Sequence, residues 1–453
     1  MKRSAEPAMR GTPSLGLAGA TLGFFFGFSA VALFGPAAKE LKHVMALSPL
    51  QLGFLVAAPA LSGSLLRIPF AAWVDRDGGR RPFLTLLILS IIGMAGLYLL
   101  FHFLYPARIG PAFYPLLMLL GVLCGCGIAV FSVGIGQVSY WFPQNQQGWS
   151  LGVYAGIGNL APGLFSILLP IVLSSWSLAG AYLAWLLFLL LGTVSYALTG
   201  RNAWYFQFVK QGIEPARARE LAAERGQQIF PGGSAAAALK LSAQQWRTWA
   251  LVFLYFTTFG GFLCLTSWMP VYWSGYFRLG AREAGILTAI FSLLASGIRV
   301  FGGTWSDLVG GERTSIVSLS VLMGGAFLMA LSHSFPLSLT AEMIVAVGMG
   351  VNNAAVFKML PKFVPNAVGG AAGWVGGIGA FGGFLLPPLM GLFVEHGGDP
   401  GYAQGFLVFV ALSLTSLGLS INLSIGSRKR LVGSRAAPAA FSEKPVGRKR
   451  STL

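Results

Sequence analysis

Twelve apolar runs, each long enough to cross a bilayer, constrain this 453-residue chain more than any other feature. A helix needs about 20 apolar residues to span the hydrocarbon core. With 55% hydrophobic and 10% charged residues, the chain has too little polar surface for a soluble fold of this length. We therefore predict an all-α polytopic membrane protein with 12 transmembrane helices in two six-helix bundles. The runs lie at about 15–35, 50–73, 82–104, 112–137, 148–173, 178–199, 248–270, 283–304, 314–334, 337–360, 368–393 and 403–425.

Polar stretches separate the two sets of runs and define the expected domains. These are an N-terminal segment 1–14, an N-terminal bundle 15–199, a linker 200–247, a C-terminal bundle 248–425 and a basic tail 426–453. The first run is too long for a signal-peptide core, so the N-terminal segment is expected to be retained. Within the linker, residues 214–225 are expected to form a short surface helix, followed by a flexible Pro-Gly-Gly-Ser segment.

The distribution of basic residues predicts the orientation in the membrane. Positive charge concentrates on the cytoplasmic side of membrane proteins. If both termini are cytoplasmic, only five of the 31 Lys and Arg residues fall in outer loops, namely Lys39, Lys42, Arg108, Arg278 and Arg282. We therefore predict a multi-pass protein of the cytoplasmic (inner) membrane with both termini inside. The net charge of +17 is explained by this concentration of basic residues on the cytoplasmic side.

Few partners are expected beyond the membrane itself. The basic tail is expected either to contact anionic lipid head groups or, as a disordered segment, only to fix the topology. A nucleic-acid partner is not expected, because the chain has no folded basic module. Cys124, Cys126 and Cys264 all lie inside apolar runs, so neither a disulfide framework nor a metal site is predicted. We expect a monomer without a cofactor.

Two arginines lie deep in apolar runs, where a guanidinium group costs at least about 2.5 kcal/mol on insertion scales. Both belong to one repeated pattern of Arg, seven residues, Asp, two residues, Gly-Gly, one residue and Arg. The copies comprise Arg67, Asp75, Gly78, Gly79 and Arg81 in the first half, and Arg299, Asp307, Gly310, Gly311 and Arg313 in the second. Each Asp marks a helix end, so at about 1.5 Å per residue each inner arginine lies roughly 12 Å deep. The repetition predicts a functional pair of arginines.

A second repeat relates the fifth and eleventh runs. FPQNQQGWSLGVYAGIG at 142–158 matches FVPNAVGGAAGWVGGIG at 363–379. Glycines at every fourth residue give each helix a smooth face that another helix can approach closely. The glycines of interest are Gly148, Gly152, Gly156 and Gly158 in the first copy, and Gly373, Gly377 and Gly379 in the second. Both helix packing and a direct role beside a functional site would explain them.

These motifs resemble a known family. The repeated halves, with DRDGGRR and SDLVGGER, resemble the major facilitator superfamily and its cytoplasmic loop motif. LLRIPF, RVFGG, GVYAGIGNLAPG and GWVGGIGAFGGFLLPP are more specific and resemble the membrane arginines and paired signatures of nitrate/nitrite porters of the NarK type. The resemblance covers nearly all of residues 15–425. It implies a major facilitator fold in which Arg67 and Arg299 bind the anion between the two halves.

The resemblance also implies further site residues. In the family, two aromatic positions, a tyrosine and an asparagine complete the pocket; here they read Phe131, Phe259, Tyr255 and Asn159. The second signature has Ala380 where the first has Asn159, so the halves are not chemically symmetric there. The loop motifs imply a latch between helix ends that acts in gating rather than binding, formed here by Asp75, Arg76, Arg81, Asp307 and Arg313.

The residue chemistry agrees with a small planar anion. A guanidinium fork can meet two oxygens of nitrate or nitrite at once, which a lysine ammonium cannot do. Tyr255 and Phe259 are four residues apart and therefore share a helical face, where the tyrosine adds a hydroxyl donor. The electronegative faces of Phe131 and Phe259 are expected to limit thickness and exclude water rather than attract the anion.

The expected function is secondary transport of nitrate and nitrite by alternating access. All four histidines lie in or near outer loops, and Glu342 is the only acid well inside an apolar run. Exchange of one anion for the other therefore fits better than proton symport, which Glu342 keeps open. The residues also allow a carrier of another small anion, such as cyanate, formate or a dicarboxylate, and a non-transporting anion receptor on the same fold. An enzyme is not expected, because no nucleophile, base and metal constellation occurs in the runs.

Overall fold

The computed structural model describes residues 9–232 and 235–436, and these contain 12 helical spans long and apolar enough to cross a membrane. The described ranges contain no strand, so the predicted all-α fold is confirmed. The first six spans are α1 (Pro13–Phe28) with η1 (Ser29–Ala32), α3 (Pro49–Leu65) with α4 (Arg67–Asp77), α5 (Arg80–Leu104), α6 (Tyr114–Trp141), α7 (Gln147–Gly158) with α8 (Ala161–Ser175), and α9 (Leu178–Thr199). The last six are α13 (Trp246–Tyr255) with η4 (Phe256–Gly260) and α14 (Gly261–Tyr276), α15 (Ala281–Val309), α16 (Gly311–Leu331), α17 (Phe335–Phe363), α18 (Val368–Gly377) with η6 (Gly379–Phe381) and α19 (Gly382–Gly397), and α20 (Asp399–Gln404) with α21 (Leu407–Ala436).

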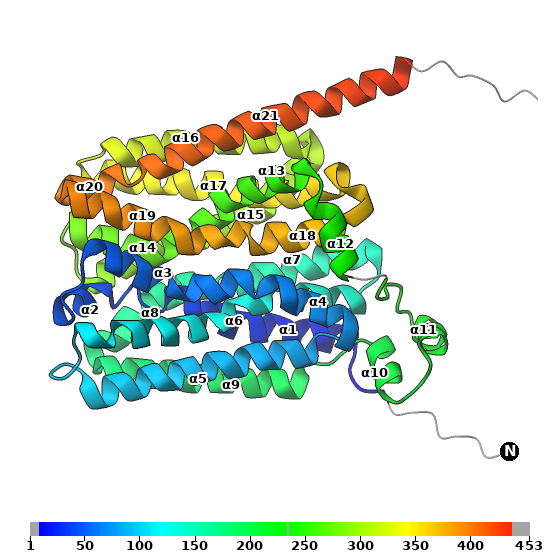
Figure 1. Ribbon diagram of the computed structural model, residues 1–453, viewed down its shortest axis with the longest axis horizontal. Coiled ribbons are helices and arrows are strands. Elements are labelled where there is room, and N and C mark those ends of the chain that lie inside the picture. The colour runs from blue at the N-terminus through cyan, green and yellow to red at the C-terminus, as the bar shows by residue number, and fades with distance from the viewer. Residues whose placement is uncertain (1–8, 233–234, 437–453) are drawn as a thin grey trace, which may run out of the picture.

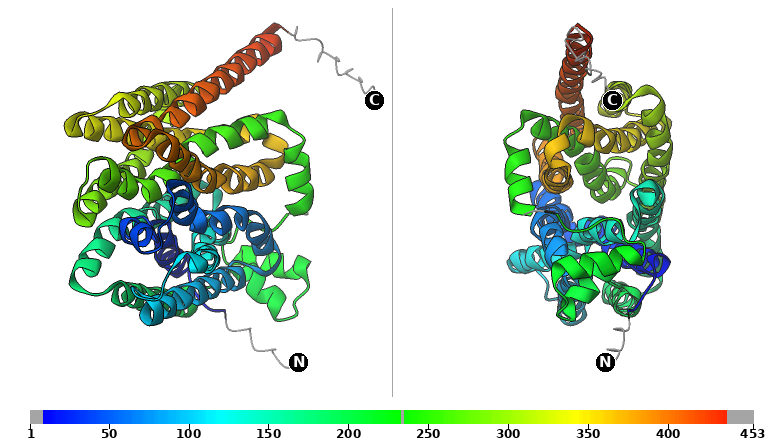
Figure 2. Two further views of the ribbon diagram at one scale, coloured as in Figure 1. Left: turned by 60° about the vertical axis from the view of Figure 1, so that its left-hand side comes forward. Right: turned by 90° about the vertical axis from the view of Figure 1, so that its right-hand side faces the viewer.

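The two sets of spans form two bundles that lie side by side, with the earlier helices below the later ones in Figure 1. Three short helices lie between the bundles in sequence, namely α10 (Trp204–Lys210), α11 (Pro215–Glu224) and α12 (Ala235–Ala243). The helix α11 confirms the surface helix predicted at 214–225. We call the end of the molecule that carries α10, α11 and α12 the linker face. The opposite end, which carries α2 (Ala38–Val44) and α20, is the far face (Figures 1 and 2).

Four spans are interrupted inside the bundle. The second span breaks at Leu66, the fifth at Asn159 and Leu160, and the eleventh around η6. In the seventh span, Phe256–Gly260 form a π-turn, which accommodates one extra residue in the helix. The interruptions of the seventh and eleventh spans meet, because an added Cβ at Gly260 would lie 2.7 Å from the Gly379 carbonyl oxygen. By contrast, the eighth span is one continuous helix, α15.

On the far face, the two bundles are joined by the ends of α3 and α19. The Glu395 carboxylate accepts hydrogen bonds from the Ser48 hydroxyl at 3.2 Å and from the Leu50 amide at 3.1 Å. An added Cβ at Gly53 would lie 2.6 Å from the carbonyl oxygen of Pro387. The two helices therefore meet backbone to backbone and leave no passage between them at this end.

Candidate functional site

Arg67 is the first residue of α4, directly after the break at Leu66, and its side chain is fully buried. Its guanidinium donates from Nε to the Gly63 carbonyl at 2.9 Å and from Nη1 to the Gly376 carbonyl at 3.1 Å. Both carbonyls lie in the last turn before a helix interruption, where backbone oxygens are free to accept from side chains. The remaining nitrogen, Nη2, has no hydrogen-bond partner among the described residues. It is a buried charged donor that is available to a ligand.

Arg299 approaches the same place from the other bundle. It lies within the continuous helix α15 and is half-buried. Its guanidinium carbon lies 5.9 Å from the centroid of the Phe259 ring, and that of Arg67 lies 5.2 Å from the same centroid. The structure thus brings together the two arginines that the sequence repeat paired.

Aromatic rings surround the two guanidinium groups. The Phe131 ring lies 4.8 Å from the guanidinium carbon of Arg67. Phe259 stacks on Tyr255, with ring centroids 4.8 Å apart and ring planes 10° apart, and lies 6.1 Å from Phe131. The π-turn is the segment that carries Phe259. All three predicted aromatic residues therefore lie at the arginine pair.

Buried polar atoms without partners gather at the same place. The side-chain oxygens of Asn159 and Asn353 are buried and have no hydrogen-bond partner in the described part of the chain, and the buried Tyr255 hydroxyl lies beside Arg299. Asn159 and Asn353 line one small cavity together with Phe259 and Arg299. Buried polar groups are nearly always paired in folded proteins, so this cluster has the character of a binding site.

Asn353 is a site residue that the sequence interpretation missed. It lies on α17, in the apolar run expected at 337–360, and directly follows Asn352. Two consecutive amides in a membrane helix are rare, because each needs a polar partner there. The consecutive amides Asn352 and Asn353 were therefore the sequence feature that could have indicated a polar site on this helix. Ser296, which lines the same cavity and donates to the Asn159 carbonyl at 3.1 Å, had no comparable signal in the sequence.

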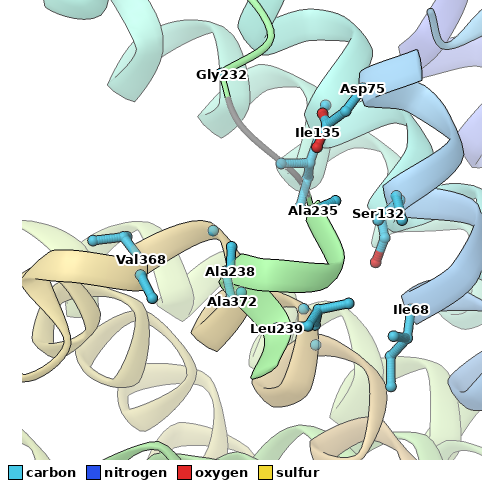
Figure 3. Close-up of a pocket in the computed structure, with 18 of the residues that line it drawn as sticks. Ile68, Asp75, Ser132, Ile135, Gly232, Ala235, Ala238, Leu239, Val368 and Ala372 are labelled. Atoms are coloured by element: carbon cyan, nitrogen blue, oxygen red, sulfur yellow. The ribbon is translucent and has the colours of Figure 1, made fainter. Parts of the chain in front are cut away.

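A larger cavity of about 480 Å³ leads from the linker face toward the arginines. The second and fourth spans line one side and the tenth and eleventh spans the other, and the cavity ends at Phe131 and Gly376, both of which contact Arg67. The helix α12 lies across this space and contributes Ala238 and Leu239 to its wall (Figure 3). It is fixed to α18 by a hydrogen bond from Trp374 Nε1 to the Leu239 carbonyl at 3.0 Å. The site is therefore reached from the linker face, past α12.

The first copy of the loop motif lies at the linker face. Asp75 accepts a hydrogen bond from the Tyr140 hydroxyl of the fourth span at 2.7 Å, so its partner here is a neutral group rather than a basic residue. Arg76 forms an ion pair at 3.5 Å with the neighbouring Asp77, and Arg81 is exposed. In this conformation the motif joins the second span to the fourth within one bundle.

The second copy of the loop motif is held by ionic contacts instead. Asp307 pairs with Lys358 of the tenth span, and the neighbouring Glu312 pairs with Lys362. Arg313 is exposed. The eighth span is thereby joined to the tenth, which is the same arrangement within the second bundle, formed by different chemistry.

The predicted glycine faces differ from one another in what covers them. An added Cβ at Gly148, Gly152 or Gly156 would meet nothing within 4 Å, so the close helix approach expected there is absent in this conformation. The remaining predicted glycines are packed. An added Cβ would lie 1.8 Å from Phe24 at Gly158, 3.2 Å from Leu239 at Gly373, 2.6 Å from Ile68 at Gly377 and 2.9 Å from Tyr255 at Gly379.

Glu342 lies apart from the arginines, near the far-face end of α17. It is fully buried, and one of its oxygens accepts a hydrogen bond from Trp273 Nε1 at 3.4 Å. The other carboxyl oxygen has no partner within the described ranges. A buried carboxyl group with one free oxygen is suited to carry a proton.

Comparison with known proteins places the chain among membrane transporters. A model of the Major Facilitator Superfamily matches residues 20–387 and 272–451. The chain is 29% identical to the probable nitrate/nitrite antiporter NarK1 of Thermus thermophilus, over 89% of this chain and 90% of that protein. It is 29% identical to the probable nitrate/nitrite transporter NarK2 of Mycobacterium tuberculosis, over 86% of this chain and 91% of that protein. It is 25% identical to the nitrite extrusion protein of Bacillus subtilis, over 88% of this chain and 92% of that protein.

Solved structures support the fold alone. The xylose transporter XylE from E. coli superposes with a TM-score of 0.68 at 13% identity, covering 96% of this chain and 99% of XylE. A bacterial homolog of the human lysosomal transporter Spinster gives a TM-score of 0.64 at 16% identity, covering 95% of this chain and all of that chain. From its family match, its 12 spans and its relatives, the chain belongs to the major facilitator superfamily, and its resemblance to the NarK-type nitrate/nitrite porters is confirmed.

Proposed function

We propose that this chain is a secondary transporter that exchanges nitrate and nitrite across the cytoplasmic membrane. The observation that carries the proposal is the convergence of Arg67 and Arg299 on Phe259 inside the bundle. One buried and one half-buried cation, with no acid beside them among the described residues, need an anion to compensate their charge. The names of the relatives, which refer to nitrate and nitrite, support the choice of anion.

The donors at the site suit a small planar oxyanion. Arg67 offers Nη2, and the Tyr255 hydroxyl lies within electrostatic range of both arginines. The rings of Phe131 and Phe259 flank the guanidinium of Arg67 and leave little room for water or for a bulky substrate. An anion held by charge-assisted hydrogen bonds in such a dry site is bound far more strongly than in water.

The state of the two faces supports alternating access. The contacts of α3 with α19 close the far face, while the 480 Å³ cavity reaches the site from the linker face. The excess of basic residues at the linker face supports a cytoplasmic orientation of that face. The molecule would then be in an inward-facing state, and rocking of the two bundles about the site would open the far face.

Exchange follows from the charges of the empty site. Without an anion, closing the bundles would bury two uncompensated guanidinium groups in a low-dielectric gap. A bound anion removes this penalty, so the carrier would cross the membrane loaded in both directions. Proton-coupled nitrate symport is the second candidate, and the buried Glu342 with its free oxygen is the observation that favours it.

Counterflow in liposomes tests both candidates. Purified protein is reconstituted with nitrite inside and labelled nitrate outside at matched pH, with an internal pH dye. Exchange predicts nitrate entry that requires internal nitrite and carries no proton. Nitrate accumulation in nitrite-free liposomes that is driven by a pH gradient and abolished by Glu342→Gln would establish symport instead.

The same liposomes distinguish a nitrate carrier from a carrier of another anion and from a receptor. Competition by cyanate, formate or a dicarboxylate that exceeds competition by nitrite would identify a carrier of another anion. Tight nitrate binding without flux under any gradient would identify a receptor. The Arg299→Lys variant is the matched negative control, because it retains the positive charge, loses the fork and breaks none of the backbone hydrogen bonds that Arg67 makes.

A further inference from the structure

A second cavity, distinct from the transport path, lies at the linker face of the first bundle and has a volume of about 680 Å³. Its wall is formed by the N-terminal segment, the turn between α4 and α5, the end of α9, and α10. Among the described residues, six basic side chains line it, namely Arg10, Arg76, Arg80, Arg81, Arg201 and Lys210, against a single acid, Asp77. The only ion pair that the described residues place there joins Arg76 and Asp77. The cavity is therefore strongly positive.

Hydrogen bonds that are independent of any ligand build the wall of this cavity. The Asn202 side chain accepts from the Arg80 amide at 2.8 Å and donates to the Asp77 carbonyl at 3.0 Å. Gln207 links α10 to the N-terminal segment, accepting from the Arg10 amide at 3.0 Å and donating to the Arg10 carbonyl at 2.8 Å. The basic side chains are thus gathered by fixed backbone rather than by mobile loops.

The charges in the cavity are left without sufficient counter-charge. Arg80 donates from Nη2 to the Ala197 carbonyl at 2.8 Å, but its Nε is buried and has no partner among the residues described. Burial, followed by the positive charges of Arg80 and Arg10, lowers the pKa of Arg201. Like charges held this close favour the binding of an anion between them.

Two apolar helix faces lead from the membrane into this cavity. On α5, the face that carries Arg81 and Leu84 continues with Ile88 and Ile92, whose side chains are 50% and 53% exposed. On α9, Val194 and Leu198 are 55% and 66% exposed, share one helical face, and lie in the last two turns before the helix ends at Thr199, two residues before Arg201. Residues at three- and four-residue spacing share a helical face. Acyl chains on these faces would place a head group in the cavity.

We propose that this cavity binds the phosphate head group of an anionic phospholipid from the leaflet at the linker face. Arginine forks bind phosphate oxygens in pairs, and the cluster lies where head-group phosphates of that leaflet occur. A free phosphate ion would use the same basic side chains but would leave the apolar approach on α5 and α9 without a role. The site is independent of the transported anion and of the basic tail.

The test compares lipid retention by matched variants. Full-length protein is exchanged into phosphatidylcholine nanodiscs containing a minor fraction of phosphatidylglycerol, and the lipids that remain bound are counted by native mass spectrometry. The triple variant R10Q/R201Q/K210Q removes three charges from the cavity. The control R219Q/R225Q/K240Q removes three charges from exposed positions of α11 and α12 and the turn after α11, away from it.

We expect the cavity variant to lose phosphatidylglycerol retention by more than about tenfold, and the control to retain it as wild type does. Lys210→Gln alone, at an exposed helix end that takes part in none of the hydrogen bonds described for the wall, should lower retention by about threefold to fivefold, which guards against misfolding of the triple variant. Equal retention by the two triple variants would overturn the proposal. Complete displacement of phosphatidylglycerol by millimolar inorganic phosphate would also overturn it, in favour of a free phosphate site. Neither outcome depends on nitrate or nitrite flux.

Discussion

Arg67 and Arg299 occupy equivalent positions of the sequence repeat, yet the two bundles hold them differently. Arg67 follows a helix break, is fully buried and donates to two backbone carbonyls, one of them in the opposite bundle. Arg299 lies in an unbroken helix, is half-buried and borders the small cavity with Asn159 and Asn353. Two backbone carbonyls fix the direction of the Arg67 guanidinium. The Arg299 guanidinium, in contrast, can move with the bundle that carries it. The repeat thus supplies one fixed and one adjustable half of the proposed anion site.

The largest effect is expected for Arg67→Lys, because this change removes a part of the fold as well as the ligand fork. An ammonium group cannot reach the Gly63 and Gly376 carbonyls and the anion together, and a buried acceptor left unpaired costs about 1–3 kcal/mol. Nitrate affinity should fall on the order of 100-fold or more, and Tm should fall as well. Isothermal titration and thermal unfolding of the purified variant measure the two losses. Near-normal affinity in folded protein would remove Arg67 from the site.

Arg299→Lys should abolish uptake with a comparable loss of affinity but leave Tm close to that of wild type. The Arg299 guanidinium lies over Phe259 and beside the cavity, so its replacement affects the ligand more than the packing. Isothermal titration and thermal unfolding of the purified variant measure the affinity and Tm. If both lysine variants lost Tm to the same extent, the distinction between a fixed and an adjustable arginine would be lost.

The neighbouring amides Asn353 and Asn352 offer a sharper contrast on one helix. Asn353 has a buried oxygen without a described partner, whereas Asn352 accepts from Ser315 and donates to Thr258. Asn353→Ala should weaken nitrate binding by about tenfold and leave stability unchanged or raised. Asn352→Ala should do the reverse, lowering stability by about 1–3 kcal/mol with little change in affinity. Binding isotherms and unfolding curves of the two variants measure nitrate affinity and stability. A loss of binding confined to Asn352→Ala would exclude Asn353 from the site.

The uncovered glycine face of the fifth span predicts a variant that is defective in motion only. An added side chain at Gly152 meets nothing in the present conformation, but it would obstruct approach of the facing bundle when the linker face closes. Gly152→Leu should keep nitrate affinity and slow exchange by about tenfold or more. Gly418→Leu, at an equally open position on α21, is the control and should exchange normally. Exchange at the wild-type rate in Gly152→Leu would show that this face never closes.

The smallest effects are expected at the two loop motifs, where Asp75 in the first bundle can be compared with Asp307 in the second. Asp75→Asn keeps an oxygen that can accept from Tyr140, and Asp307→Asn breaks an exposed pair with Lys358 that is worth about 1 kcal/mol or less. Both variants should alter turnover and the balance of inward- and outward-facing states, with nitrate affinity within about threefold of wild type. Cysteine accessibility at each face and equilibrium binding measure these quantities. A large loss of affinity with unchanged accessibility would contradict a gating role.

The sequence was sufficient to predict the fold and most of the candidate site. The fold follows from the length of the apolar runs, and the candidate site follows mainly from repeated motifs. The spans follow from apolar runs, and the arginine pair follows from one repeated spacing. Tyr255 and Phe259 followed from the family resemblance. None of these inferences depends on knowing how one helix packs on another.

The remaining features depend on tertiary contacts, which a periodic pattern does not encode. The break at Leu66 and the π-turn interrupt runs whose apolar length predicts regular helix, and the polar residues and the proline nearby did not specify where or how the helix would be interrupted. Asn353 was visible as a polar residue, but its place beside Asn159 requires the fifth and tenth spans to meet at one cavity. The helix α12 forms in a segment whose Pro-Gly-Gly-Ser start indicated flexibility, and it is held there by Trp374 from a distant span.

The π-turn at Phe256–Gly260 makes the site sensitive to the length of the chain as well as to its side chains. Removing one residue from this turn would convert it to regular α-helix with little change in the length of the span, and every residue named at the site could remain. The bulge that positions the residues of the turn would be lost, however, so Phe259 would be displaced from its place between Arg67 and Arg299. A single codon deletion could therefore erase anion recognition in a chain that still inserts, spans and packs.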